Sequence, residues 1–168
     1  MNKYTADELF KIAYGHLKKK EFEKSSQLFE KLLKDFPDNL SILVNISHSY
    51  AFSGAFKKAE ECIKKIIKIK PDEPFAYQFL ASVLKNQDKI EEMIEIVNEG
   101  LEKNLINKKW ELQKKLLSPL IAKDKKEIDD YRKKIEKGLE EIINSDIKLD
   151  YDNDQIISPP LFELSYTN

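Results

Sequence analysis

The segment Leu40–Glu73, LSILVNISHSYAFSGAFKKAEECIKKIIKIKPDE, decides the fold because its pattern recurs on both sides of it. Pro37 and Pro71 lie 34 residues apart and set the register. Two further units of the same length flank the segment, Ala6–Asn39 and Pro74–Asn107. Large apolar residues recur at some equivalent positions and small residues at others. A fixed period of this length indicates stacked supersecondary units that bury one another's apolar faces.

The spacing inside each unit is helical. In the first unit, apolar residues recur at steps of three and four, as Leu9, Ile12, Ala13 and Leu17. Thr5 and Glu8 form the sequence pattern of a capping box. Turn-prone pairs separate the two halves of each unit: Lys20-Glu21, Ser53-Gly54 and Gln87-Asp88. The sequence therefore predicts six helices, near residues 6–19, 22–35, 39–53, 56–69, 73–86 and 90–104.

Composition excludes several functional classes. Lysine plus arginine number 29 against 30 acidic residues, and this balance argues against nucleic acid or an anionic membrane as partner. No apolar stretch is long enough for a membrane span, and residues 1–20 lack a secretory signal. The single cysteine, Cys62, permits no internal disulfide, and we expect it to be buried or half-buried. We expect a cytoplasmic location.

One family resemblance follows from the second unit. It resembles the tetratricopeptide repeat (TPR) at seven signature positions: Leu43, Ile46, Tyr50, Gly54, Phe56, Ala59 and Pro71. The resemblance implies an all-α fold, a right-handed α-α superhelix of about three helix pairs. We expect three TPR units over residues 5–106, capping helices over 107–145, and an acidic, proline-containing tail or linker over 146–168. Within the capping part, Trp110 is expected to cover the end of the array.

The resemblance also implies a binding groove lined by the first helix of each pair. Read onto this chain, the candidate partner-binding residues are Phe10, Tyr14, Asn45, His48, Phe52, Phe75, Gln78, Phe79 and Ser82. Exposed aromatic rings beside adaptable polar groups suit capture of a peptide or protein. Two alternatives stay open: these rings face a ligand, or they are covered by a neighbouring segment or packed between repeats.

Some TPR proteins clamp the terminal carboxylate of chaperones with basic and amide side chains. The corresponding positions here hold Phe10, Tyr14, Asn45, Phe75 and Phe79. Since only Asn45 fits that set, the resemblance argues against a carboxylate clamp.

The last forty residues carry a second resemblance. YRKKIEKGLEEI, followed by an acidic linker and SPPLFELSYTN, resembles the junction between repeats and catalytic region in O-GlcNAc transferase and SPINDLY-type glycosyltransferases. This resemblance implies an alternative function, the acceptor-recognition arm of such an enzyme, without catalytic residues in this chain.

The sequence contains no catalytic motif that would favour an enzyme over a binding protein. The four glycines are scattered, so no phosphate-binding loop exists, and His16 and His48 lack metal-ligand spacing. We therefore predict a non-enzymatic scaffold that needs no cofactor or metal and binds a protein or peptide. Self-association through the first helix or the Trp110 region is a further possibility.

Overall fold

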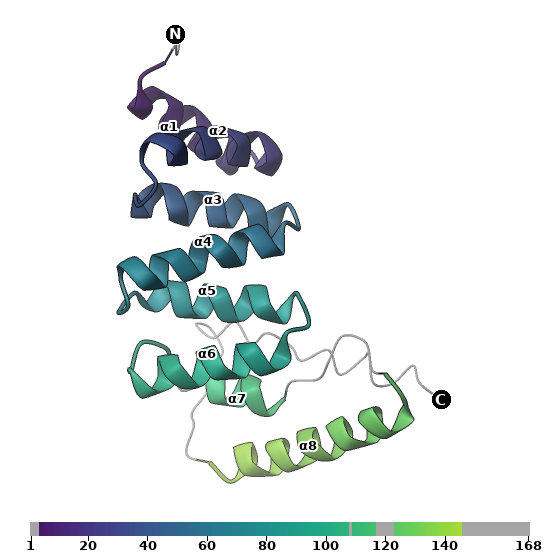
Figure 1. The fold of residues 1–168 in the computed structure, drawn as a ribbon. Helices are drawn as coiled ribbons and strands as arrows, with labels where there is room; N and C mark the ends of the chain where they lie inside the picture. Colours follow the sequence, from purple (N-terminus) through teal and green to yellow (C-terminus); the bar gives the residue numbers. More distant parts are fainter. Residues whose placement is uncertain (1–3, 108, 117–122, 146–168) are drawn as a thin grey trace. The chain divides into compact units, whose positions relative to one another are not determined.

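The computed structural model describes residues 4–107, 109–116 and 123–145, and all regular structure in these ranges is α-helical. The helices in chain order are α1 (Ala6–Lys18), α2 (Phe22–Asp35), α3 (Leu40–Phe52), α4 (Phe56–Ile69), α5 (Pro74–Lys85), α6 (Ile90–Glu102), α7 (Lys109–Lys115) and α8 (Lys125–Ile143). The six helices expected from the repeat are confirmed to within a residue or two at each end (Figure 1). The expected tail over 146–168 lies outside the described residues.

The 34-residue period is visible in the backbone. Lys20, Gly54 and Asp88 stand one period apart, and each has a positive φ, of 60°, 80° and 58°. Each forms the turn between the two halves of a unit, where the chain must reverse direction in few residues. Only Gly54 adopts this left-handed conformation without a steric penalty, because it lacks a Cβ.

The capping box expected at Thr5 and Glu8 forms, and α8 is capped as well. The Thr5 hydroxyl accepts from the Glu8 backbone N–H at 3.3 Å, and the Glu8 carboxylate accepts from the Thr5 backbone N–H at 2.9 Å. At the start of α8, the Asp124 carboxylate accepts from the Glu127 N–H at 2.8 Å. Both arrangements satisfy backbone donors that the first helical turn leaves without a partner.

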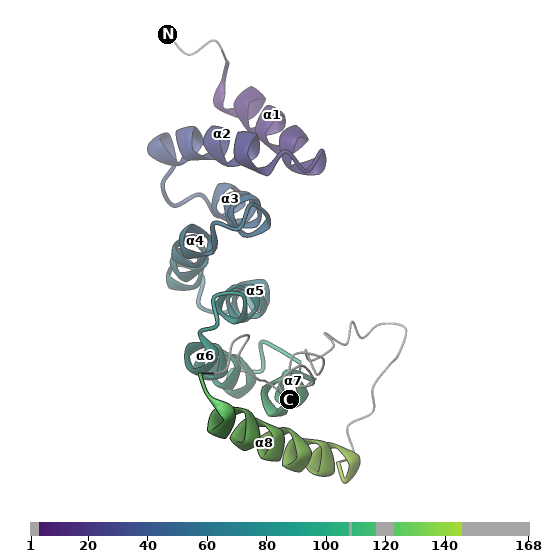
Figure 2. The same cartoon turned by 90° about the vertical axis from the view of Figure 1, so that its right-hand side faces the viewer.

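The chain divides into two compact units, one ending at Gln87 and the other beginning at Asp88. In the first unit, helices α1 to α5 pack in chain order, each against the next (Figure 2). Its core is formed by apolar side chains that are at most 3% exposed: Ala13, Phe29, Leu32, Ile42, Leu43, Ile46, Ala59, Ile63, Ile66, Ala76, Tyr77, Leu80, Ala81, Val83 and Leu84.

In the second unit, α7 contacts both α6 and α8. Its buried residues include Met93, Val97, Ile106, Leu112 and Ile135. Helices α7 and α8 lie within the range 107–145, in which residues 108 and 117–122 lie outside the described part of the chain. Trp110 lies in α7 and is half-buried.

Buried serines connect α1, α2 and α3 by hydrogen bonds. The Ser25 hydroxyl donates to the Ala13 carbonyl at 3.0 Å and lies 2.9 Å from the Ser49 hydroxyl, and both serines are fully buried. The small side chains let three helices approach closely while every buried hydroxyl keeps a partner.

Candidate functional site

The predicted groove residues all lie on α1, α3 and α5 of the first compact unit. These are the alternate helices of the stack, as the repeat requires. Their side chains nevertheless fall into three groups with different surroundings.

The first group is a continuous cluster of rings. The His48 ring lies 4.7 Å from the Phe79 ring and 5.3 Å from the Phe75 ring, measured between centroids. Phe75 and Phe79 lie 5.2 Å apart. These centroid distances lie within the range over which aromatic rings attract one another. A histidine from α3 thus sits against two phenylalanines of α5.

The cluster extends along α3 to Phe52 and from there to Phe22 of α2, a residue that the sequence analysis did not predict. Phe52 stacks 6.1 Å from His48 on one side and 5.2 Å from Phe22 on the other. Phe22 is the first residue of α2, so the band of rings joins three helices. We call the five residues His48, Phe52, Phe75, Phe79 and Phe22 the ring cluster. Its outer member, Phe52, is 64% exposed, whereas His48, Phe75 and Phe79 are half-buried.

The signal for Phe22 was present in the sequence. An aromatic ring recurs at its position in the second repeat unit as Phe56, one of the TPR signature residues. The recurrence gives no information about which ring of the next helix it meets.

The second group consists of polar residues that bond to their own helix. The Asn45 amide donates to the Ser41 carbonyl at 2.7 Å, and the Ser82 hydroxyl donates to the Gln78 carbonyl at 3.0 Å. Gln78 is exposed, and its side chain is available for contact. These groups flank the ring cluster and can reorient toward a ligand at the cost of one local bond.

The third group lies on α1, apart from the ring cluster. Phe10 packs edge-to-face on the fully buried Phe29 at 5.4 Å, so its ring contributes to the core of the first repeat. Tyr14 is 40% exposed, and the Lys18 ammonium lies 5.3 Å from the centre of its ring. The structure therefore brings His48, Phe52, Phe75 and Phe79 together and leaves Phe10 and Tyr14 outside that contact.

The surroundings of His48 have an electrostatic consequence. Burial lowers the pKa of His48 below its usual value, because a charged imidazolium loses hydration among the rings. No neighbouring charge contributes to the shift. The ring is thus neutral at pH 7, and the cluster offers an uncharged aromatic surface.

Because protonation of His48 is unfavourable in the folded state, lowering the pH should reduce the stability of the fold. An unfolded chain takes up a proton at His48 near pH 6.5, whereas the folded chain resists it. The contribution of a neutral His48 is therefore complete above that pH and falls as the pH drops below it. We expect the free energy of unfolding of the wild type, relative to a His48→Phe variant, to fall between pH 7.5 and pH 5. Urea denaturation measures both proteins. A difference in free energy of unfolding that stays constant across this pH range would contradict the lowered pKa of His48.

The surroundings of Cys62 do not activate its thiol. Burial raises the pKa of the Cys62 thiol to about 11, so this half-buried cysteine is a poor nucleophile. Among the described residues, no group of three or more histidine, cysteine or acidic side chains could hold a metal ion. No described helix has the length and apolar character needed to cross a bilayer.

Comparison with known proteins agrees with this architecture. Residues 16–84 match the tetratricopeptide repeat family. No curated protein matches the chain. Solved structures do, and the family model that matches is that of a repeat.

Three of the similar structures illustrate the likeness. MamA from Desulfovibrio magneticus RS-1 has 16% identity and a TM-score of 0.62, over 86% of this chain and 80% of that one. The Sgt2 TPR domain from Aspergillus fumigatus has 19% identity and a TM-score of 0.54, over 91% and 92%. The first TPR domain of Spaghetti (RPAP3), bound to the HSP90 peptide SRMEEVD, has 15% identity and a TM-score of 0.53, over 83% and 94%. At such identities the likeness concerns the fold alone.

Proposed function

We propose that the tetratricopeptide repeats within residues 16–84 form a scaffold that binds an apolar segment of another protein through the ring cluster. The observation that carries the proposal is the contact of His48 with Phe75 and Phe79, which joins α3 to α5 on the predicted groove. Large aromatic surfaces that are only half-buried dominate the energetics of many protein interfaces. TPR modules bind proteins and peptides, as the similar RPAP3 domain does with its HSP90 peptide.

The chemistry of the cluster favours an internal segment over a chain terminus. Positions where the carboxylate clamp needs cations hold Phe75 and Phe79, and His48 is neutral. A terminal carboxylate placed there would lose hydration without gaining an ion pair. Apolar and aromatic side chains would lose no such hydration, and they would gain burial against the rings.

The alternative role as an acceptor-recognition arm of a glycosyltransferase rests on the final forty residues. Residues 146–168 lie outside the described part of the chain, and no observation of the described part favours that role. The binding module is accordingly the function for which we design a test.

Peptide selection from a random library tests the proposal. Peptides displayed through their carboxyl end carry no free C-terminus, so any enrichment reports on internal segments. We expect the wild type to enrich sequences with aromatic or large aliphatic residues. A Phe75→Ala/Phe79→Ala variant should bind the same peptides at least about tenfold more weakly, since two ring contacts are lost.

Two further variants separate binding from folding. Phe36 is 44% exposed at the end of α2 and lies outside the ring cluster, so Phe36→Ala should leave peptide affinity unchanged. Phe52→Ala removes a largely exposed ring and should weaken binding while the circular dichroism spectrum stays helical. Equal affinity of the wild type and both cluster variants would refute the assignment of the site.

A further inference from the structure

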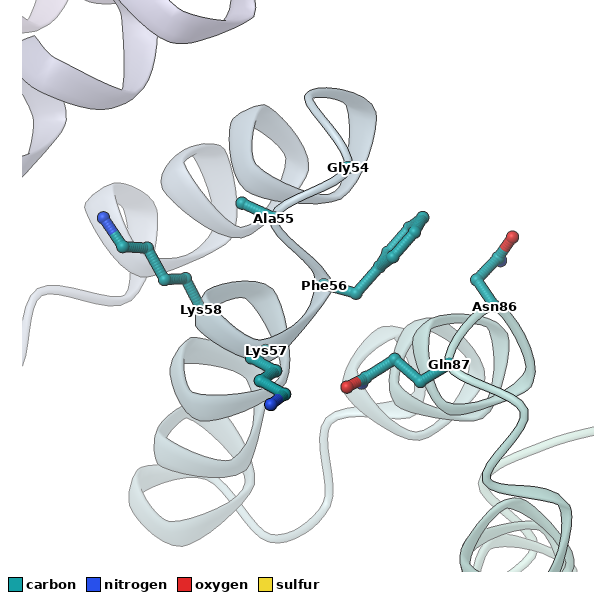
Figure 3. A pocket seen from close by; sticks show the side chains of 7 residues that line it. All are labelled: Gly54, Ala55, Phe56, Lys57, Lys58, Asn86 and Gln87. Atoms are coloured by element: carbon teal, nitrogen blue, oxygen red, sulfur yellow. The ribbon is translucent and has the colours of Figure 1, made fainter.

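A pocket lined by none of the ring-cluster residues lies at the edge of the first compact unit. It has a volume of about 480 Å³ and lies between the start of α4 and the end of α5 (Figure 3). Its lining residues are Gly54, Ala55, Phe56, Lys57, Lys58, Asn86 and Gln87. In Figure 3 the Phe56 ring points toward the gap on the side of Asn86.

The repeat explains why this pocket exists. Phe56 opens α4 as Phe22 opens α2, one period earlier. At the earlier position, the Phe22 ring is covered by Phe52, which stacks on it at 5.2 Å with the ring planes 25° apart. One period after Phe52 stands Asn86, whose amide donates to the Ser82 carbonyl of its own helix at 2.8 Å. The Phe56 ring therefore has no aromatic partner among the described residues, and the space of the missing ring stays open.

The rim of the pocket carries two lysines, and only one of them is paired with a carboxylate of the described residues. Lys58 pairs with the Glu30 carboxylate at 3.1 Å, whereas Lys57 is exposed and no described carboxylate pairs with it. The Gln87 amide is engaged, since it donates to the Glu60 carboxylate at 2.8 Å. The pocket thus combines a half-buried ring, on which no other described ring stacks, with an exposed ammonium group that no described carboxylate pairs with.

We propose that this pocket receives an aromatic side chain of a partner peptide that carries an acidic residue next to it. The partner's ring stacks on Phe56 as Phe52 stacks on Phe22, and its carboxylate faces Lys57. The chain itself supplies the template for the occupant, because the same backbone arrangement holds a phenylalanine one repeat earlier. The neighbouring cation selects the acidic flank by charge complementarity. The pocket and the ring cluster share no residue, so one partner segment can contact both.

Short blocked peptides test the proposal on the full chain. The probe is the capped tetrapeptide Ser-Phe-Asp-Ser, and the controls are Ser-Leu-Asp-Ser and Ser-Phe-Lys-Ser. Amide shifts in NMR titrations locate each peptide. The probe should shift the amides of residues 54–58 and 86–87, with about tenfold weaker affinity when leucine replaces phenylalanine. Absence of shifts there, or shifts confined to His48, Phe75 and Phe79, would overturn the second site without touching the proposed function.

Substitutions at one position give a matched pair. Asn86→Phe should close the pocket by copying the earlier stack, so probe binding at residues 54–58 is lost while the melting temperature rises. Asn86→Ala leaves the pocket open and should keep the affinity. Probe binding that survives in Asn86→Phe, or disappears equally in both variants, would contradict the proposal.

A Lys57→Glu variant should reverse the preference between the aspartate and lysine peptides. An unchanged preference would show that Lys57 does not select an acidic residue in the partner.

Discussion

Replacing Phe29 with alanine is expected to lower the free energy of unfolding by about 3–5 kcal/mol, the largest effect we foresee for a single substitution. Phe29 lies on α2 and is 0% exposed, and Phe10 of α1 packs edge-to-face on it at 5.4 Å. Truncation removes the apolar burial of a whole ring and leaves a cavity where the first two helices meet. In a stack of repeats each unit is stabilised by its neighbours, so the substitution should also destabilise the helices that pack against α2.

Phe36→Ala provides the matched control for this loss. The same residue type stands at the end of the same helix, but its side chain is 44% exposed. We expect a change within about 1 kcal/mol, since little burial is lost. Urea denaturation followed by circular dichroism measures both variants. If the two substitutions cost the same, the assignment of Phe29 to the core is wrong.

The helices of the repeat were predictable because two independent signals agree along the chain. Apolar spacing fixes which residues are helical, and the 34-residue period fixes where each helix stops. Lys20 and Asp88 show how firmly the period acts: neither is glycine, yet both take the left-handed turn that Gly54 takes with ease. Neighbouring helices impose that turn, so its location followed from the period even where local preference opposes it.

The candidate site was only partly predictable, because facing the groove does not determine what a side chain touches. Phe10 occupies a predicted groove position, yet its ring packs on Phe29. His48 reaches Phe79 from another helix, and the pairing depends on how α3 and α5 pack. Such contacts between helices depend on side-chain rotamers and interhelical spacing, which periodicity does not encode.

The pocket beside Phe56 could have been predicted in part from the repeat period. Comparing Phe52 with Asn86 in register reveals a ring that is present in one repeat and missing in the next. That comparison needs only the sequence. Its consequence needs the structure, which shows that Phe52 covers Phe22. A departure from a repeat therefore carries functional information once the contact of the regular residue is known.

The same substitution, glycine to alanine, is expected to act with opposite sign at two helical positions. Gly15 lies inside α1, and a Cβ added there would meet no atom within 4 Å. Alanine should therefore stabilise the chain by about 0.5–1 kcal/mol, because it reduces the backbone freedom of the unfolded state and suits a helix. Gly138 lies inside α8, where an added Cβ would lie 2.8 Å from the Lys115 carbonyl oxygen and 3.0 Å from the Lys115 Cβ.

At Gly138 the clash outweighs the helical preference. The obstructing oxygen and the carbonyl carbon behind it, at 3.3 Å, belong to the backbone of α7 and cannot rotate away as a side-chain tip would. Alanine should force α7 and α8 apart and cost about 1–3 kcal/mol, the range for overpacking. Hydrogen exchange by NMR reports the loss locally, as faster exchange in residues 125–143, while thermal denaturation should show a gain for Gly15→Ala. A stabilising effect at both positions would mean that α7 does not approach α8 as closely as the structure shows, and that helical preference alone decides.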